Sequence, residues 1–111
     1  MSANKRKGTA WESQVVAYLR DRGWMHVERR ALNGAKDRGD VAGIPGLVVE
    51  CKAASRHELA AWVDEAKTER DNDGAKYGVV WVKRRGKGTP RDAFVVMDGD
   101  TFADLLAEAG Y

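Results

Sequence analysis

The spacing of apolar residues predicts helices in several parts of this chain. The first is expected to begin at Thr9 and to end at Gly23, since a glycine after basic residues is typical of a helix C-terminus. The second is expected to begin in Ser55-Arg56-His57-Glu58, which has the form of a capping box, and to stop near Gly74. Their apolar faces are predicted to consist of Trp11, Val15, Tyr18 and Leu19, and of Leu59, Trp62, Val63 and Ala66.

The two ends of the chain differ in character. Residues 1–7 are polar and basic, and we expect a flexible lead-in because none of them can pack into a core. At the other end, Asp100 is predicted to cap a last helix that Gly110 closes. Residues 8–111 are long enough for one domain with a modest core. The inward face of the last helix is predicted to contain Phe102, Leu105 and Leu106.

Shorter apolar runs between these helices predict strands. The run Leu47–Cys51 is typical of a central strand that is covered on both faces. The helix that follows it is the usual crossover to a parallel strand, so the chain is predicted to have an α/β fold with a mixed central sheet flanked by helices. The other predicted strands are Trp24–Arg29, a segment at Asp40, Tyr77–Val82 and Ala93–Met97.

Composition indicates where the chain is expected to act. The net charge is +2, but residues 1–56 carry 11 basic and 6 acidic residues, whereas residues 57–111 carry 8 and 11. This asymmetry is typical either of a face that attracts polyanions or of ordinary solvated surface. Cys51 is the single cysteine, so we expect a packing role, no internal disulfide and a reducing compartment. With no apolar span and no signal-peptide core, an intracellular, cytoplasmic protein without a membrane partner is predicted.

The segment from Gly39 to Lys52 carries the main candidate chemistry. Glu50 and Lys52 are expected on the same face of their strand, and the turn Ile44-Pro45-Gly46 folds Asp40 back alongside as a hairpin. Two adjacent carboxylates repel each other and lose solvation, a cost that a divalent cation relieves. This set of charged groups suits metal-dependent phosphodiester hydrolysis. The alternative, a same-face ion pair at an exposed strand, is disfavoured by the apolar neighbours.

Asp40 followed by Glu50-Cys51-Lys52 resembles the motif of the PD-(D/E)xK nuclease superfamily. The predicted order of helices and strands is similar to the restriction-endonuclease-like core that the superfamily shares. Within it, residues 5–106 look most like the small archaeal-type Holliday junction resolvases. The resemblance implies a Mg²⁺-dependent (or Mn²⁺-dependent), structure-selective DNA endonuclease that acts as a homodimer and makes paired nicks in four-way DNA junctions.

In the mechanism that the resemblance implies, Asp40 and Glu50 bind the cation, which polarises the scissile phosphate and lowers the pKa of a bound water. Lys52 stabilises charge on the attacking water or the phosphate. Resolvases of this type place a metal-site glutamate in the first helix, and Glu12 is its counterpart here. From spacing alone an alternative stays open, because Thr9-Ala10-Trp11-Glu12 also has the form of a capping box.

Other functions stay open at the level of sequence. The same fold would suit a flap, nick or duplex endonuclease of the repair or restriction type, and a non-catalytic DNA-binding module is a further hypothesis. The apolar stripe with Trp62 either packs within the monomer or contributes to a two-fold interface. His26 and His57 lack zinc-ligand spacing and are expected at the surface.

Basic residues outside the motif are candidate phosphate contacts, with solubility as the alternative role. Asn33 would take the place of a catalytic serine that several of the resolvases carry in this loop. The four tryptophans are expected in core or dimer contacts rather than stacked on bases. The candidate DNA-binding residues are Lys5, Arg6, Lys7, Arg29, Arg30, Asn33, Lys36, Arg38, Lys83, Arg84, Arg85 and Lys87.

Overall fold

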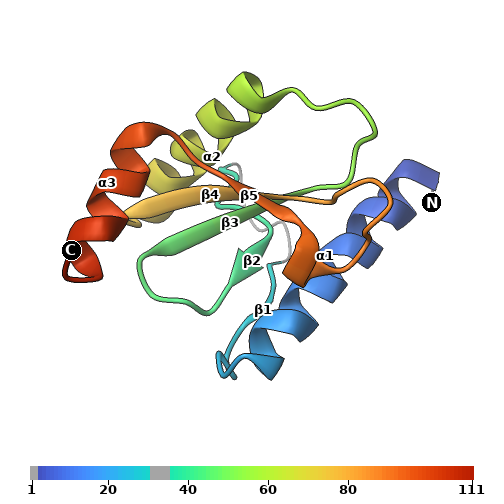
Figure 1. Cartoon of the computed structure of the whole chain (residues 1–111), viewed down its shortest axis with the longest axis horizontal. Helices are drawn as coiled ribbons and strands as arrows, with labels where there is room; N and C mark the ends of the chain where they lie inside the picture. The colour runs from blue at the N-terminus through green and yellow to red at the C-terminus, as the bar shows by residue number, and fades with distance from the viewer. Residues whose placement is uncertain (1–2, 31–35) are drawn as a thin grey trace.

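The computed structural model describes residues 3–30 and 36–111, which form a mixed, open sheet of five strands with three α-helices (Figure 1). The predicted order of helices and strands is confirmed. No helix in the described part is both long and apolar enough to cross a membrane. The elements are α1 (Ala3–Asp21), β1 (Glu28–Arg29), β2 (Val41–Ala42), β3 (Leu47–Lys52), α2 (Leu59–Asp73), β4 (Tyr77–Val82), the 3₁₀ turn η1 (Pro90–Asp92), β5 (Phe94–Val96) and α3 (Gly99–Glu108).

The strands lie in the order β1-β2-β3-β4-β5. β3 and β4 are parallel because α2 carries the chain back across the sheet between them, and the other neighbouring pairs are antiparallel. The predicted hairpin joins β2 to β3, and the Leu47 amide donates to the Ile44 carbonyl at 3.1 Å. Val41 pairs with Val49, so the residues just before β2 lie beside the middle of β3.

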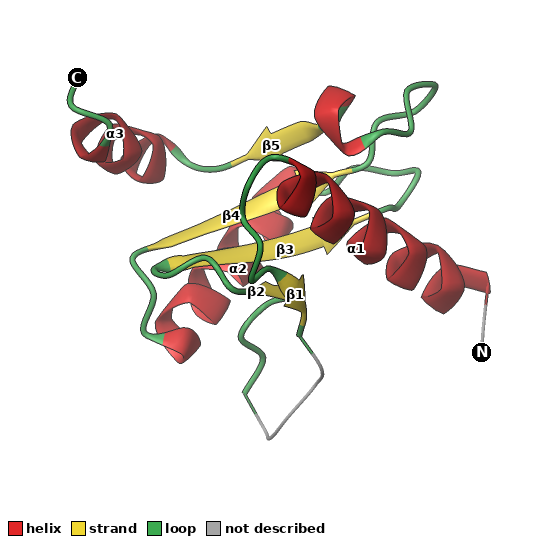
Figure 2. Ribbon diagram, turned by 90° about the horizontal axis from the view of Figure 1, so that it is seen from below, coloured by secondary structure: helices red, strands yellow, loops and turns green. Residues whose placement is uncertain are grey.

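Different helices cover the two faces of the sheet (Figure 2). Because strand side chains alternate, Val49 and Cys51 enter the core under α1, whereas Glu50 and Lys52 face the side of α2. The buried position of Cys51 confirms its packing role. The core under α1 contains Trp11, Val15, Val16, Leu19, Val27, Val41, Val49, Cys51 and Val79, and the core under α2 contains Trp62, Ala66, Val80 and Val82.

The first helix is longer than predicted. α1 begins at Ala3 rather than at Thr9, so residues 3–7, which were assigned to the lead-in, form its first turns. Lysine and arginine are good helix formers, and the chain continues the helix through them. Glu12 therefore lies inside α1, and the capping-box interpretation of Thr9 to Glu12 is wrong because a cap acts only where free amides remain.

The second helix is shorter than predicted at its start. α2 begins at Leu59, its N-cap residue is Glu58, and the cap makes no side-chain hydrogen bond. The predicted capping box at Ser55 is therefore wrong: the chain after β3 bends at Ser55 and Arg56, and the helix begins only at Leu59. The predicted end is correct, since Gly74 caps α2 in the left-handed conformation with φ 68°.

The last helix begins before its predicted cap. Asp98, not Asp100, is the N-cap, and its Oδ1 atom accepts a hydrogen bond from the Thr101 amide at 2.9 Å. Thr101 lies on the buried side of α3, while Phe102 is 53% exposed and Leu106 is also exposed. The predicted inward face is therefore wrong at both of these positions.

The outer strands are shorter than predicted. β1 contains only Glu28–Arg29, because the chain after α1 first makes a turn in which the Trp24 amide donates to the Leu19 carbonyl at 3.0 Å. Trp24 is 46% exposed, so it is not part of the core of this chain. Val27 is the residue of this segment that packs under α1. β5 is limited to Phe94–Val96.

α2 and β4 approach each other most closely at Gly78. A Cβ atom there would lie 2.5 Å from the main-chain oxygen of Ala66. We expect Gly78→Ala to lower the free energy of unfolding by roughly 1–3 kcal/mol, the usual cost of overpacking. Gly99→Ala is the control, because a Cβ at Gly99 has no neighbour within 4 Å among the described residues. Urea denaturation measures both; wild-type stability of Gly78→Ala would contradict the packing described.

Candidate metal centre

Glu50 is a charged side chain in a buried strand. It is 3% exposed, between Val49 and Cys51 in β3. Its Oε1 atom has no hydrogen-bond partner in the described part of the chain, which is costly for a buried carboxylate and indicates a missing partner. Burial first, and then the neighbouring carboxyls of Asp40 and Glu65, raise the pKa of Glu50 well above its ordinary value.

The β2–β3 hairpin holds Asp40 beside Glu50. The Asp40 amide donates to the Val49 carbonyl at 3.0 Å, and the Cys51 amide donates to Asp40 Oδ2 at 2.8 Å. Asp40 is therefore fastened to β3 on either side of Glu50, by its main-chain amide at Val49 and by its carboxyl group at Cys51. Gly39 permits the chain to turn into the hairpin at this point, since its φ of 93° is one that other residues rarely adopt. The two acids of the predicted motif thus lie together.

Lys52 lies next to one acid of β3, Glu50, and one acid of α2, Glu65. Its Nζ atom is 3.7 Å from Glu50 Oε2 and 3.0 Å from Glu65 Oε2. Burial alone would lower the pKa of Lys52, but the Glu65 and Glu50 carboxylates outweigh it and raise that pKa. The ammonium therefore stays charged at the position that the motif predicted, and it neutralises part of the surrounding negative charge.

Glu12 approaches the site from α1. It pairs with Arg29, whose Nε atom lies 3.2 Å from Glu12 Oε1. Burial first, and then the charge of Asp40, raise the pKa of Glu12, so the two carboxyls are electrostatic neighbours. In the described part of the chain, however, Glu12, Asp40 and Glu50 do not form one close group of possible ligand atoms.

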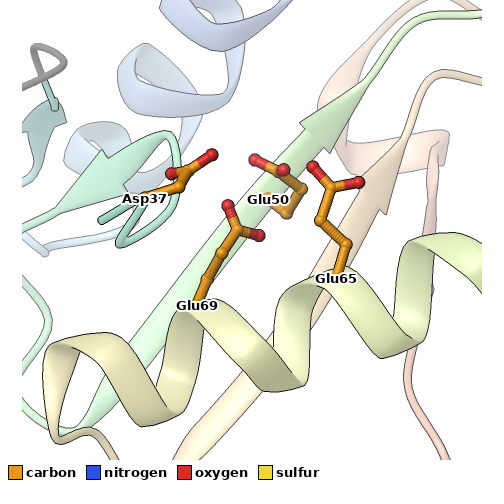
Figure 3. Close-up of side chains that lie close together, drawn as sticks. All are labelled: Asp37, Glu50, Glu65 and Glu69. Atoms are coloured by element: carbon orange, nitrogen blue, oxygen red, sulfur yellow. The ribbon is translucent and has the colours of Figure 1, made fainter. Parts of the chain in front are cut away.

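The structure gathers a different set of carboxylates around Glu50 (Figure 3). Glu65 and Glu69 extend from α2, and Asp37 comes from the loop before β2. One oxygen of each of the four residues lies within 4.8 Å of the others. Glu69 is 1% exposed, and neither of its carboxylate oxygens has a partner among the described residues. Burial is the main cause that raises the pKa of Glu69 to about 8.

The sequence analysis did not single out Asp37, Glu65 or Glu69. A signal for Glu69 was present, because it falls on the same helical stripe as Trp62 and Ala66, both of which are buried. An acid in an apolar stripe needs a partner, as Glu50 does in its strand. Asp37 carried no such signal, since its position depends on how the loop folds against α2.

The chemistry of these side chains fits a hard divalent cation. Mg²⁺ and Ca²⁺ prefer oxygen ligands, and the carboxylates around Glu50 provide only oxygen. The unpartnered oxygens of Glu50 and Glu69 are the atoms that such an ion would satisfy. Zinc is a poor fit, because Cys51 faces the opposite core and His26 and His57 are exposed, as predicted.

An open, basic pocket of about 720 Å³ begins where β3 ends. It brings together the start of α1, the segment after Lys52 and the loop after β4. Four of the predicted DNA-binding residues therefore share one surface near the carboxylates. We call this the basic pocket; its lining includes Lys7, His57, Lys83, Arg84 and Arg85.

Several other predicted DNA-binding residues pair with acids of the chain. Arg29 binds Glu12, and Arg30 and Arg38 lie 3.3 and 3.9 Å from Asp73 Oδ1. The two contacts with Asp73 join Arg30 and Arg38 to the end of α2, and contact of the three arginines with DNA stays a prediction. Lys5, Arg6, Lys36 and Lys87 are exposed, and Asn33 lies outside the described residues.

Comparison of the chain with models of protein families, with curated proteins and with solved structures found no match. The site is therefore interpreted from its own residues. Its firm features are a buried glutamate with an unpartnered oxygen, a second acid fastened beside it and a charged lysine at 3.7 Å.

Because of the buried acids, the free energy of unfolding of the metal-free protein should depend on pH. The pKa of Glu69 rises from its ordinary 4.5 to about 8 on folding, so the folded state holds a proton more tightly than the unfolded state. The free energy of unfolding should therefore fall as the pH rises through this window, and Glu50 acts in the same direction.

Urea denaturation in EDTA at several pH values tests this dependence. Glu69→Gln should flatten the decline, whereas Asp104→Asn, at an exposed position of α3, should leave it unchanged. Wild-type stability that rises between about pH 5 and pH 8 would contradict the electrostatics described.

Proposed function

We propose that this protein is a metal-dependent DNA endonuclease of the PD-(D/E)xK type, and specifically a homodimeric Holliday junction resolvase. The observation that carries the proposal is the arrangement in β3: Glu50 is buried with an unpartnered oxygen, Asp40 is fastened beside it, and Lys52 lies 3.7 Å away. A protein gains no stability from such a group, so a chemical role explains why it is there.

The topology supports the proposal. A helix, a β-hairpin that carries Asp40 and Glu50, and a crossover helix to a parallel strand follow one another in the order of the restriction-endonuclease-like core. Asp40 and Glu50 meet here because the hairpin pairs Val41 with Val49. This closeness of Asp40 and Glu50 supports their proposed shared role.

Each residue of the chain has a distinct part in the proposed reaction. Asp40 and Glu50 hold Mg²⁺ or Mn²⁺, with Glu12 as a further acid beside Asp40. When bound, the cation supplies charge that polarises the phosphate and acidifies a water. Lys52 donates hydrogen bonds to the negative charge that develops on phosphate or water, and its contact with Glu65 at 3.0 Å orients it.

The basic pocket is the proposed contact for DNA phosphates. It begins directly after Lys52, so a backbone that crosses it passes close to the catalytic residues. Contacts to phosphates give affinity and orientation but little discrimination between bases. Such binding suits an enzyme that recognises the shape of branched DNA.

Dimerisation follows from the proposed activity, since paired nicks in a four-way junction need two sites. Within the stripe on α2, Trp62 and Ala66 pack in the core of this chain, while Leu59 is exposed. Phe94 and Val95 on β5 and Phe102 on α3 are exposed and provide apolar surface for a second copy.

Catalysis is tested with Asp40→Asn, Glu50→Gln and Lys52→Ala on a labelled immobile four-way junction and a matched linear duplex. Each variant should lose at least about a hundredfold in cleavage rate but still bind the junction, because each removes a group that acts on the reacting phosphate. The controls are Asp100→Asn and Lys76→Ala, both exposed and remote in sequence from the motif.

The products distinguish the possible functions. Mg²⁺-dependent, symmetrical nicks in the junction alone support a resolvase. Cleavage of flaps, nicked DNA or duplex as well would replace this proposal by a general nuclease of the same fold. Binding without cleavage, unaffected by EDTA, would replace it by a DNA-binding module.

DNA binding by the basic pocket is tested with the double variant Lys83→Ala/Arg85→Ala. The variant should bind more weakly, and the slope of log affinity against log salt should fall by about 2, one for each lost phosphate contact. Lys76→Ala, at the opposite end of β4, is the matched control and should keep the wild-type slope. An unchanged slope in the double variant would exclude the basic pocket as the contact.

A further inference from the structure

We infer that the four carboxylates gathered between β3 and α2 form a divalent-cation site of their own, which we call the α2 site. Its ligands are Asp37, Glu50, Glu65 and Glu69. The motif of the proposed nuclease predicts a different set, in which Glu12 and Asp40 accompany Glu50. The α2 site shares only Glu50 with that set, and it requires no DNA.

The burial of Glu69 without a partner is the observation that carries this inference. Its side chain is 1% exposed and aims into the space between the four carboxyls (Figure 3). Both of its oxygens are buried and lack a partner among the described residues. Buried carboxylate oxygens in native proteins are nearly always satisfied by a donor or a cation. An ion at this point would satisfy both Glu69 and the unpartnered Oε1 of Glu50.

The balance of charge leads to the same conclusion. Among the described residues, Lys52 forms ion pairs with this cluster, through Glu50 and Glu65. One ammonium cannot neutralise four carboxylates, so in the metal-free protein the raised pKa values of Glu50 and Glu69 keep protons on the cluster, which a bound cation would displace. A divalent cation supplies the missing positive charge at the side of the cluster that Lys52 does not contact.

The spacing of the oxygens is compatible with a small hard cation. Two ligands on opposite sides of Mg²⁺ lie about 4.1 Å apart, and about 4.6–5.2 Å apart across Ca²⁺, given the usual metal–oxygen distances. The oxygens of the α2 site lie within 4.8 Å of one another, which is close enough for either ion to reach all four residues. Titration with each cation separates them.

The surrounding structure holds the ligands in place. Asn72, one helical turn beyond Glu69, donates from Nδ2 to the main-chain oxygen of Asp37 at 2.8 Å. The Asp37 Oδ1 atom accepts a hydrogen bond from the Gly39 amide at 2.9 Å, which fixes its carboxyl group. Lys52 fixes Glu65 at 3.0 Å. Binding a cation at a site prepared in this way requires little ordering of the protein.

Cation titration of the full chain without DNA tests the inference. After treatment with EDTA and dialysis, Mn²⁺ binding is followed by electron paramagnetic resonance, and Mg²⁺ and Ca²⁺ binding by calorimetry. Glu69→Gln should weaken the tightest site at least about tenfold, the smallest loss usual for altered metal sites. The cation should also raise the melting temperature of the wild type more than that of this variant.

Matched variants make the test decisive. Glu65→Gln should weaken the same site, and because Glu65 is partly exposed this variant guards against a folding defect in Glu69→Gln. Asp104→Asn should leave the affinity within about threefold, and Asp40→Asn should reduce it less than Glu69→Gln does. No cation binding by the wild type, or unchanged binding in both glutamate variants, would overturn the α2 site. Equal losses in Asp40→Asn and Glu69→Gln would overturn its separation from the predicted motif.

DNA cleavage is not a readout in this experiment. If the wild type binds cations through Glu69 but cuts no DNA, the α2 site stands and the proposed nuclease function fails. If DNA is cut normally by Glu69→Gln and Glu65→Gln, and neither variant loses cation affinity, the proposed nuclease function stands and the α2 site fails.

Discussion

The burial of one carboxylate governs the centre of this structure. β3 lies between β2 and β4, and α1 and α2 cover the two faces of the sheet, so Glu50 is only 3% exposed. An isolated charge in such a place is very costly, and the protein reduces the cost only in part. Lys52 supplies one positive charge at 3.7 Å, while Glu50 Oε1 stays unpartnered and Asp40 adds repulsion. This uncompensated cost is the physical reason for proposing a cation at the site.

Features that depend on residues close together in the sequence were predictable. The limits of β4 match the apolar run from Tyr77 to Val82, and the alternation of strand side chains placed Glu50 and Lys52 on one face. The hairpin brought Asp40 beside them because its turn joins neighbouring strands. Helix starts were less predictable. The α3 cap is Asp98, since Thr101 and not Phe102 turns to the buried side, and that choice depends on packing.

The positions of the α2 acids could not be predicted from the sequence, because they also depend on packing. Their place over the sheet depends on how α2 docks on β4, which the close approach of Ala66 to Gly78 determines. Neither residue by itself identifies the other as its neighbour. Docking at this contact directs Glu65 and Glu69 toward Glu50 rather than toward solvent (Figure 3). A periodic pattern predicts which face of a helix is buried, but the strand residue that it meets follows only from the tertiary structure.

The negative carboxylates and the positive basic pocket lie next to each other, and this determines how the protein can meet a polyanion. As the proposed contact for phosphates, the basic pocket would attract them, whereas ionised acids around Glu50 would repel a phosphate that approaches Lys52. A divalent cation among the acids reverses the sign of the local charge and extends the attractive surface across both regions. Cation and nucleic acid would then each strengthen the binding of the other, since such coupling is reciprocal. In this view Lys52 connects the two regions, because it contacts the carboxylates of Glu50 and Glu65 and directly precedes the lining of the basic pocket.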